Sequence, residues 1–125
     1  MNALQKIHQS LIPGGVMFDL QPALANAPVA SSSGPLGRLD ESELRKFADR
    51  VNALLQKAIS AGLFMQESEI TFTVVHRFND AAQLLANVGT WTGTRVPFTV
   101  RKRLERAVPP FEVQEGAKLR RLRAL

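Results

Sequence analysis

The sequence contains no cysteine, and none of its apolar runs is longer than three residues. Without cysteine the chain cannot form disulfides, thiolate zinc sites, iron-sulfur clusters or a cysteine nucleophile. A membrane-spanning helix needs roughly 20 apolar residues, and the polar first residues lack the apolar core of a signal peptide. We therefore expect a cytoplasmic protein that does not enter membranes.

The length and composition suit one globular domain covering residues 1–125. Domains usually hold about 100 to 200 residues, and a chain of this size buries roughly two-thirds of the surface that it exposes when unfolded. The 45% hydrophobic and 22% charged content is ordinary for such a domain.

Basic residues gather in the C-terminal quarter of the chain. The formal net charge is +5, but residues 95–125 carry nine Lys or Arg against three acids, whereas residues 1–94 have a net charge of −1. Four of the basic residues would cover most of the surface of one helix: Arg101, Lys102, Arg103 and Arg106. Weak nucleic-acid binding is one interpretation, and a solvated face is the other. The lack of aromatic residues between these charges favours the solvated face.

The N-terminal third predicts a helix, a strand and a long loop. Met1, Leu4, Ile7 and Leu11 form one apolar stripe of a helix, which Pro13, Gly14 and Gly15 end. Val16–Leu20 is then predicted to be a buried strand. Residues 21–39 are rich in Pro, Ser and Gly, and we expect them to form a loop that is a lid, a substrate-facing segment or a flexible linker.

The remainder alternates helices with strands. Asp40 and Glu43 predict a reciprocal N-cap for a long helix that Gly62 closes. Alternation predicts a strand over 70–78, and helices are expected over 81–88 and from Pro97 to about Ala107. A last strand is predicted over 117–124. This order favours an α/β chain with a small mixed sheet flanked by helices. That sheet lacks a second neighbour for the strand 16–20.

The run Leu11-Ile12-Pro13-Gly14-Gly15, between a helix and an apolar strand, resembles the second half of class I S-adenosylmethionine-dependent methyltransferase domains. The later order is also similar: a long helix ending in Ala61-Gly62-Leu63-Phe64, a strand, a helical insertion and a closing strand. The resemblance implies a partial Rossmann-like fold. Strands 16–20, 70–78 and 117–124 would be the fifth, the sixth and the reversed seventh strand.

The resemblance also implies methyl transfer from S-adenosylmethionine to an unidentified acceptor, but only within a complete domain. The family binds its cofactor through a Gly-rich loop after the first strand and an acid ending the second. No G-x-G pair occurs here, so no cofactor-binding residue is assigned and the isolated chain is not expected to catalyse. A start codon placed too late, a degenerate remnant and a split enzyme with a partner chain each explain the missing half.

Three residues are weak candidates for the acceptor side: Asp19, His76 and Trp91. Asp19 lies near the carboxyl end of the first strand, where ligands of open α/β sheets bind, or it caps a loop amide. His76 is a base or a core histidine, and Trp91 stacks on a flat acceptor or anchors the edge of the core. His8 and His76 have no third ligand at metal spacing, so no metal site is predicted.

The contrasting hypothesis is a non-catalytic interaction module. It would pair through an exposed sheet edge, by self-association or with a partner chain that supplies the missing part of the sheet.

Overall fold

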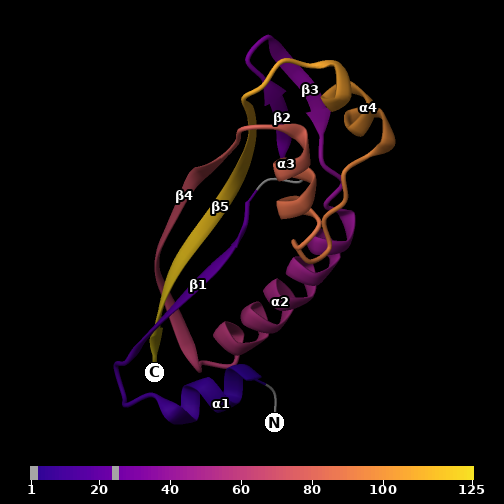
Figure 1. The fold of residues 1–125 in the computed structure, drawn as a ribbon. Coiled ribbons are helices and arrows are strands. Elements are labelled where there is room, and N and C mark those ends of the chain that lie inside the picture. The colour runs from indigo at the N-terminus through magenta and orange to yellow at the C-terminus, as the bar shows by residue number, and fades with distance from the viewer. Residues whose placement is uncertain (1–2, 24–25) are drawn as a thin grey trace.

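The computed structural model describes residues 3–23 and 26–125. In chain order the elements are α1 (Ala3–Ser10), β1 (Val16–Pro22), β2 (Pro28–Ser31), β3 (Gly34–Arg38), α2 (Ser42–Ser60), β4 (Phe64–Phe78), α3 (Ala81–Val88), α4 (Phe98–Arg106) and β5 (Phe111–Ala124). Figure 1 shows α2 lying along the sheet, with α1 at one end and α3 and α4 at the other. No helix in the described part of the chain is long and apolar enough to cross a membrane.

The sheet is built around β5, the last strand. β4 pairs with β5 over nearly the whole length of both strands. β1 pairs with residues 117–123 on the opposite edge of β5, β2 pairs with residues 111–113 on that same edge, and β3 continues from β2. The α/β class is confirmed, but the expectation of a mixed sheet is wrong because every paired strand is antiparallel to its neighbour.

The prediction of a long loop over residues 21–39 is also wrong. β1 extends to Pro22, and residues 28–38 form the hairpin β2–β3. Gly34 and Gly37 have φ of +138° and +129°, values that glycine adopts without strain. Pairing of β2 with the start of β5 stabilises the hairpin, and this contact is remote in sequence. Residues 24–25 of the predicted loop, and Met1 of the predicted helical stripe, lie outside the described residues.

The predicted helices are present, with small differences at their ends. The N-cap of α2 is Glu41 instead of the predicted Asp40, which lies one residue earlier and accepts hydrogen bonds from the Ser42 amide and hydroxyl at 3.1 and 2.7 Å. Glu43 pairs with Lys46 instead of completing the predicted reciprocal cap. Pro97 precedes α4 as its N-cap instead of lying in its first turn.

Two apolar cores lie at opposite ends of the sheet. One packs α3 and α4 against the hairpin and the start of β5: Val29, Leu36, Leu84, Val88, Val100, Leu104, Phe111 and Val113 belong to it. The other packs α1 and α2 against the end of β5, and it contains Leu55, Ala58, Phe64, Leu122 and Ala124. The second core holds the C-terminal end of α2, and the middle of the sheet is less covered.

One face of the sheet stays apolar and uncovered. Cross-strand pairing puts Leu20, Leu119 and Ile70 in one row, because directly opposed residues point to the same face. Five large apolar side chains on this face are 38 to 64% exposed: Phe18, Leu20, Ile70, Phe72 and Val74. We call them the open apolar face. Contiguous exposed apolar surface of this kind usually marks a contact site.

Two leucine substitutions should separate the covered and uncovered faces. Leu122→Ala removes a side chain that is 0% exposed, so unfolding should become easier by about 3 kcal/mol. Leu20→Ala, at 64% exposure, should cost about 0.5 kcal/mol. Urea titration followed by circular dichroism measures both values, and equal losses would show that the open apolar face is buried in solution.

Candidate functional site

Asp19 acts as the counter-ion of a buried arginine instead of capping a loop. Its Oδ2 lies 3.8 Å from Nε of Arg120, a residue that is only 4% exposed. Gln21 Nε2 donates to both Asp19 oxygens at 3.0 and 2.8 Å. Arg120 also donates to Asn52 of α2 and lies 3.4 Å from Glu69. The carboxylate is therefore engaged in joining β1, β5 and α2.

The structure explains much of the C-terminal basicity by strand pairing. Each basic residue in the second half of β5 has an acidic neighbour on β4 or β1, and the four are Lys118, Arg120, Arg121 and Arg123. On α4, Arg103 donates to the Leu36 carbonyl at 3.0 Å and Lys102 lies 3.8 Å from Glu105. Arg101 and Arg106 are exposed. The strongly basic surface is thus reduced to part of one short helix.

His76 and Trp91, the other two predicted residues, lie together. Their ring centroids are 4.8 Å apart, and His76 Nε2 is 2.9 Å from Oε2 of Glu115. The His76 and Glu115 side chains are about one-third exposed, while Trp91 packs against the core formed by α3 and α4. Asp19 does not join this pair, so the three candidates do not form one site.

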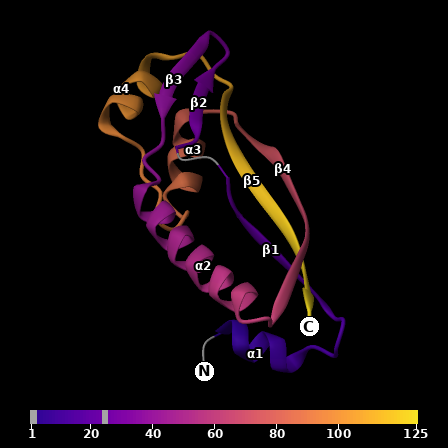
Figure 2. The ribbon, with the colours of Figure 1, turned by 180° about the vertical axis from the view of Figure 1, so that it is seen from behind.

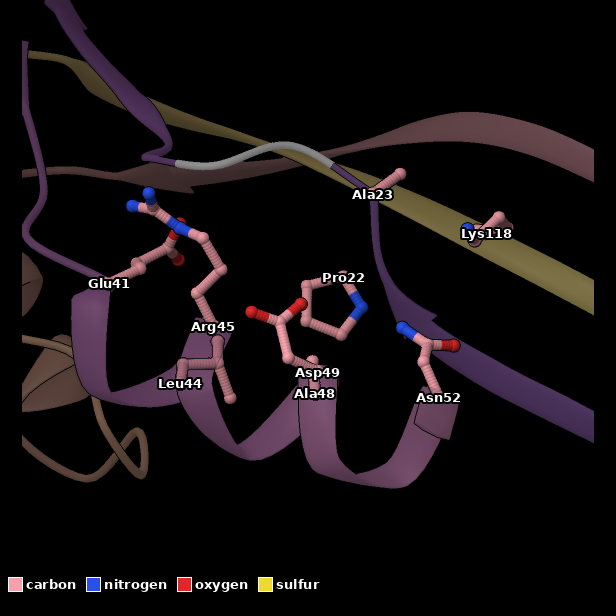
Figure 3. Close-up of a pocket in the computed structure, with 9 residues that line it drawn as sticks. All are labelled: Pro22, Ala23, Glu41, Leu44, Arg45, Ala48, Asp49, Asn52 and Lys118. Carbon is pink, nitrogen blue, oxygen red and sulfur yellow. The ribbon is translucent and has the colours of Figure 1, made fainter. Parts of the chain in front are cut away.

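A hollow of about 220 Å³ separates α2 from the carboxyl end of β1. Figure 3 shows side chains of α2 on one side of it, with Pro22, Ala23 and Lys118 on the other. Asp49 and Asn52 give its α2 wall a polar character. A second hollow of about 280 Å³ shares Pro22, Glu41 and Leu44 with the first. Its lining is mostly apolar and reaches the open apolar face: Leu20, Gln21, Pro22, Glu41, Leu44, Val74, Glu115, Gly116 and Ala117.

Glu41 is the carboxyl group common to both hollows. It is 5% exposed, and its Oε2 accepts a hydrogen bond from the Ala27 amide at 3.0 Å. Burial raises the pKa of Glu41, and the nearby Glu115 carboxylate raises it further, whereas the Ala27 amide and Arg45 lower it. A buried carboxyl with a raised pKa can hold or accept a proton nearer to neutral pH.

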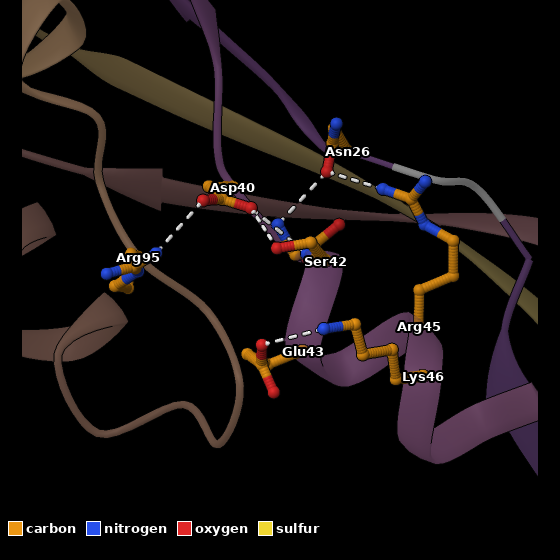
Figure 4. Close-up of polar contacts among 8 residues, drawn as sticks. Asn26, Asp40, Ser42, Glu43, Arg45, Lys46 and Arg95 are labelled. Carbon is orange, nitrogen blue, oxygen red and sulfur yellow. Dashed lines mark hydrogen bonds and ion pairs between the residues drawn. The ribbon is translucent and has the colours of Figure 1, made fainter. Parts of the chain in front are cut away.

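Polar contacts hold the start of α2 in place beside this site (Figure 4). Asn26 Oδ1 accepts from the Glu41 amide and from Arg45, each at 3.0 Å. Asp40 pairs with Arg95 through two backbone hydrogen bonds of 2.8 Å, and the hydrogen bonds from Ser42 lower the pKa of the Asp40 carboxyl. The cluster connects the ends of β2, α2 and the segment before α4, so Glu41 has a defined position.

Sequence reasoning missed Glu41 and Glu115. Glu41 stands next to Asp40, the residue predicted to cap the helix, and Glu115 stands in the basic C-terminal region, where it is one of three acids. Neither position has a motif that marks it. Glu115 comes close to His76 only through the pairing of β4 with β5. Glu41, Glu115 and His76 are therefore the candidate proton-handling groups.

Comparison of the chain with protein-family models, with curated proteins and with solved structures found no match. Within residues 3–23 and 26–125, no three His, Asp or Glu side chains are placed to hold a metal ion.

Replacement of Glu41 should change how stability depends on pH. An acid whose pKa is raised by folding does not change the free energy of unfolding below its unfolded-state pKa. It lowers that free energy as the pH rises through its folded-state pKa. Glu41→Gln should therefore melt at a higher temperature than the unsubstituted chain at pH 7.5 and at nearly the same temperature at pH 3.5. Glu105→Gln, on the exposed face of α4, is the matched control and should show no such divergence. A Glu41→Gln variant that is less stable at pH 7.5 would mean that ionised Glu41 stabilises the fold.

The remaining basic surface can be tested with duplex DNA. We expect faint binding, so replacing both exposed residues Arg101 and Arg106 with Gln should leave the salt dependence of affinity almost unchanged. Each phosphate contact would contribute roughly 0.9 to the slope of log affinity against log salt. Fluorescence anisotropy measures this slope. A slope of about four that falls by about two in the variant would establish nucleic-acid binding.

Proposed function

We propose that this chain is the acceptor-side half of a class I S-adenosylmethionine-dependent methyltransferase domain and is catalytically incomplete alone. The observation that carries the proposal is the order and direction of three strands. β1 and β4 run in the same direction, and the final strand β5 runs against both of them. The Leu11–Gly15 resemblance leads one to expect these three relative directions, with the last strand reversed, although no two neighbouring strands of the sheet are parallel.

Two uncovered surfaces support the incompleteness of the domain. β1 pairs with β5 on one edge only, and no described strand lies on its other edge. The side chains of the open apolar face are also 38 to 64% exposed, whereas doubly wound sheets are covered on both faces. A further strand and its helices would cover both surfaces at once.

The described residues do not form the loop with which the family binds S-adenosylmethionine. None of the described strands is followed by a G-x-G turn, and β1 ends at Pro22, with Ala23 after it. The hollows around Glu41 lie at the carboxyl end of β1, on the side where an acceptor would enter an open α/β sheet. Within a complete domain, Glu41, Glu115 and His76 would bind an acceptor or take its proton.

The isolated chain should bind S-adenosylmethionine with a dissociation constant above about 1 mM, because the cofactor loop and its acid lie elsewhere. Calorimetric titration at high protein concentration tests this. A micromolar constant, about −8 kcal/mol, would overturn the division into halves.

The coding sequence directly upstream provides the positive test. An in-frame segment that encodes a strand followed by G-x-G, or a co-purifying chain that contains one, is expected. The absence of both in the source cell would contradict the proposal.

An interaction module is the second candidate, favoured by the exposure of β4. Its central residues, 65–75, are all exposed, although they form part of the longest strand. The further inference concerns this strand and does not depend on methyl transfer.

A further inference from the structure

The outer edge of β4 is a long, open strand edge. β5 occupies one edge of β4, and none of the described strands pairs with the other. In Figures 1 and 2, β4 forms the outer boundary of the sheet, and α2, α3 and α4 lie away from its free edge. Exposed edges offer unpaired backbone groups to another strand, and proteins usually block them.

Hydrogen bonds at the ends of β5 show which backbone groups of β4 are free. On the β1 side, Gly116 accepts from Ala23, and Ala124 bonds to both Gly14 and Gly15. On the opposite side Leu125 donates to Leu63. Even-numbered residues of β5 therefore bond toward β1 and odd-numbered residues toward β4, because bonding direction alternates along a strand.

The register then assigns the free groups of β4. Ile70, Phe72 and Val74 pair with odd-numbered residues of β5 and are bonded inward. The intervening residues direct their backbone amides and carbonyls outward, and they are Glu69, Thr71, Thr73, Val75 and Arg77. A run of β-branched residues thus lies between an acid and a base.

We propose that a second copy of this chain pairs with this edge, antiparallel to it and centred on Thr73. Two-fold symmetry then places each Glu69 opposite Arg77 of the other copy and each Thr71 opposite Val75. Both side chains stay partly exposed, at 42% for Glu69 and 77% for Arg77, although Glu69 lies 3.4 Å from Arg120 and Arg77 lies 2.9 Å from Glu112 of its own chain. This charge complementarity makes the edge fit a copy of itself, since isologous contacts bring the same surfaces together.

The registers centred on Thr71 and Val75 lose this complementarity, and the register centred on Phe72 would put Arg77 opposite Glu67, which already pairs with Arg121 and Arg123. Moving the axis to Thr71 puts Arg77 opposite Met65, and moving it to Val75 puts Glu69 beyond the end of the opposing strand. The axis at Thr73 also joins the two open apolar faces, since Phe72 falls opposite Val74 of the second copy. Aromatic and β-branched pairs of this kind stabilise neighbouring strands.

A single introduced cysteine tests the register, because the natural chain has none. In a hydrogen-bonded pair at the axis the two Cα atoms lie about 5.5 Å apart, which suits a disulfide. Thr73→Cys should therefore form a covalent dimer on mild oxidation. Thr71→Cys is the matched control, because its two thiols would be roughly 13 Å apart along the strand.

The expected result is a dimer of the unsubstituted chain in sedimentation at 100 µM, with Thr73→Cys cross-linking at least about tenfold faster than Thr71→Cys. A monomer at that concentration, or equal rates for the two variants, would overturn the proposal.

Charge substitution provides a second measurement. Arg77→Glu should raise the dimer dissociation constant about tenfold, because it faces Glu69 of the second copy. Glu69→Gln combined with Arg77→Glu removes the repulsion between the copies without placing a positive charge beside Arg120, and it should restore the constant to within about threefold. A double variant that dimerises no better than Arg77→Glu would exclude this pairing, and thermal melting checks that each variant is folded.

Discussion

The whole sheet depends on the docking of its last strand, β5. β1, β2 and β4 all pair with β5, and β3 is connected to it through β2. Both apolar cores also contain residues of β5, Phe111 and Val113 at one end and Leu122 and Ala124 at the other. Since β1 and β5 are separated by nearly the whole chain, the sheet can form only after long loops have closed, and such closure is costly in entropy.

Arg120 sets the contact between the sheet and α2. Its guanidinium is buried, donates to Asn52 and has Asp19 and Glu69 as counter-ions. A buried charge is expensive to desolvate, and removal of one partner leaves the penalty uncompensated. The cluster therefore favours one register of β1 and β4 on β5, in which all its members meet. It also holds α2 beside the carboxyl end of β1, where the hollows around Glu41 lie.

The surfaces left uncovered provide the link between fold and function. In the proposed complete domain, further strands and helices would cover the outer edge of β1 and the open apolar face, and in the proposed dimer a second copy would cover the outer edge of β4. The two free strand edges belong to different strands, β1 and β4, so pairing at one edge leaves the other edge available. In both proposals, the isolated chain presents backbone groups and apolar side chains that a larger assembly would bury.

The sequence by itself determined the local elements. Apolar periodicity, the Pro13-Gly14-Gly15 stop and the alternation over 70–78 depend on neighbouring residues, and these elements appear in the structure. Only the tertiary structure decided the hairpin at 28–38, the antiparallel pairing and the place of the candidate site, because they depend on contacts between distant segments. The position of Asp19 near the end of a strand predicted a site residue, whereas the structure pairs Asp19 with Arg120. Glu41 has no motif that marks it in the sequence. A carboxylate's role depends on its counter-ions and burial, which are properties of the folded chain.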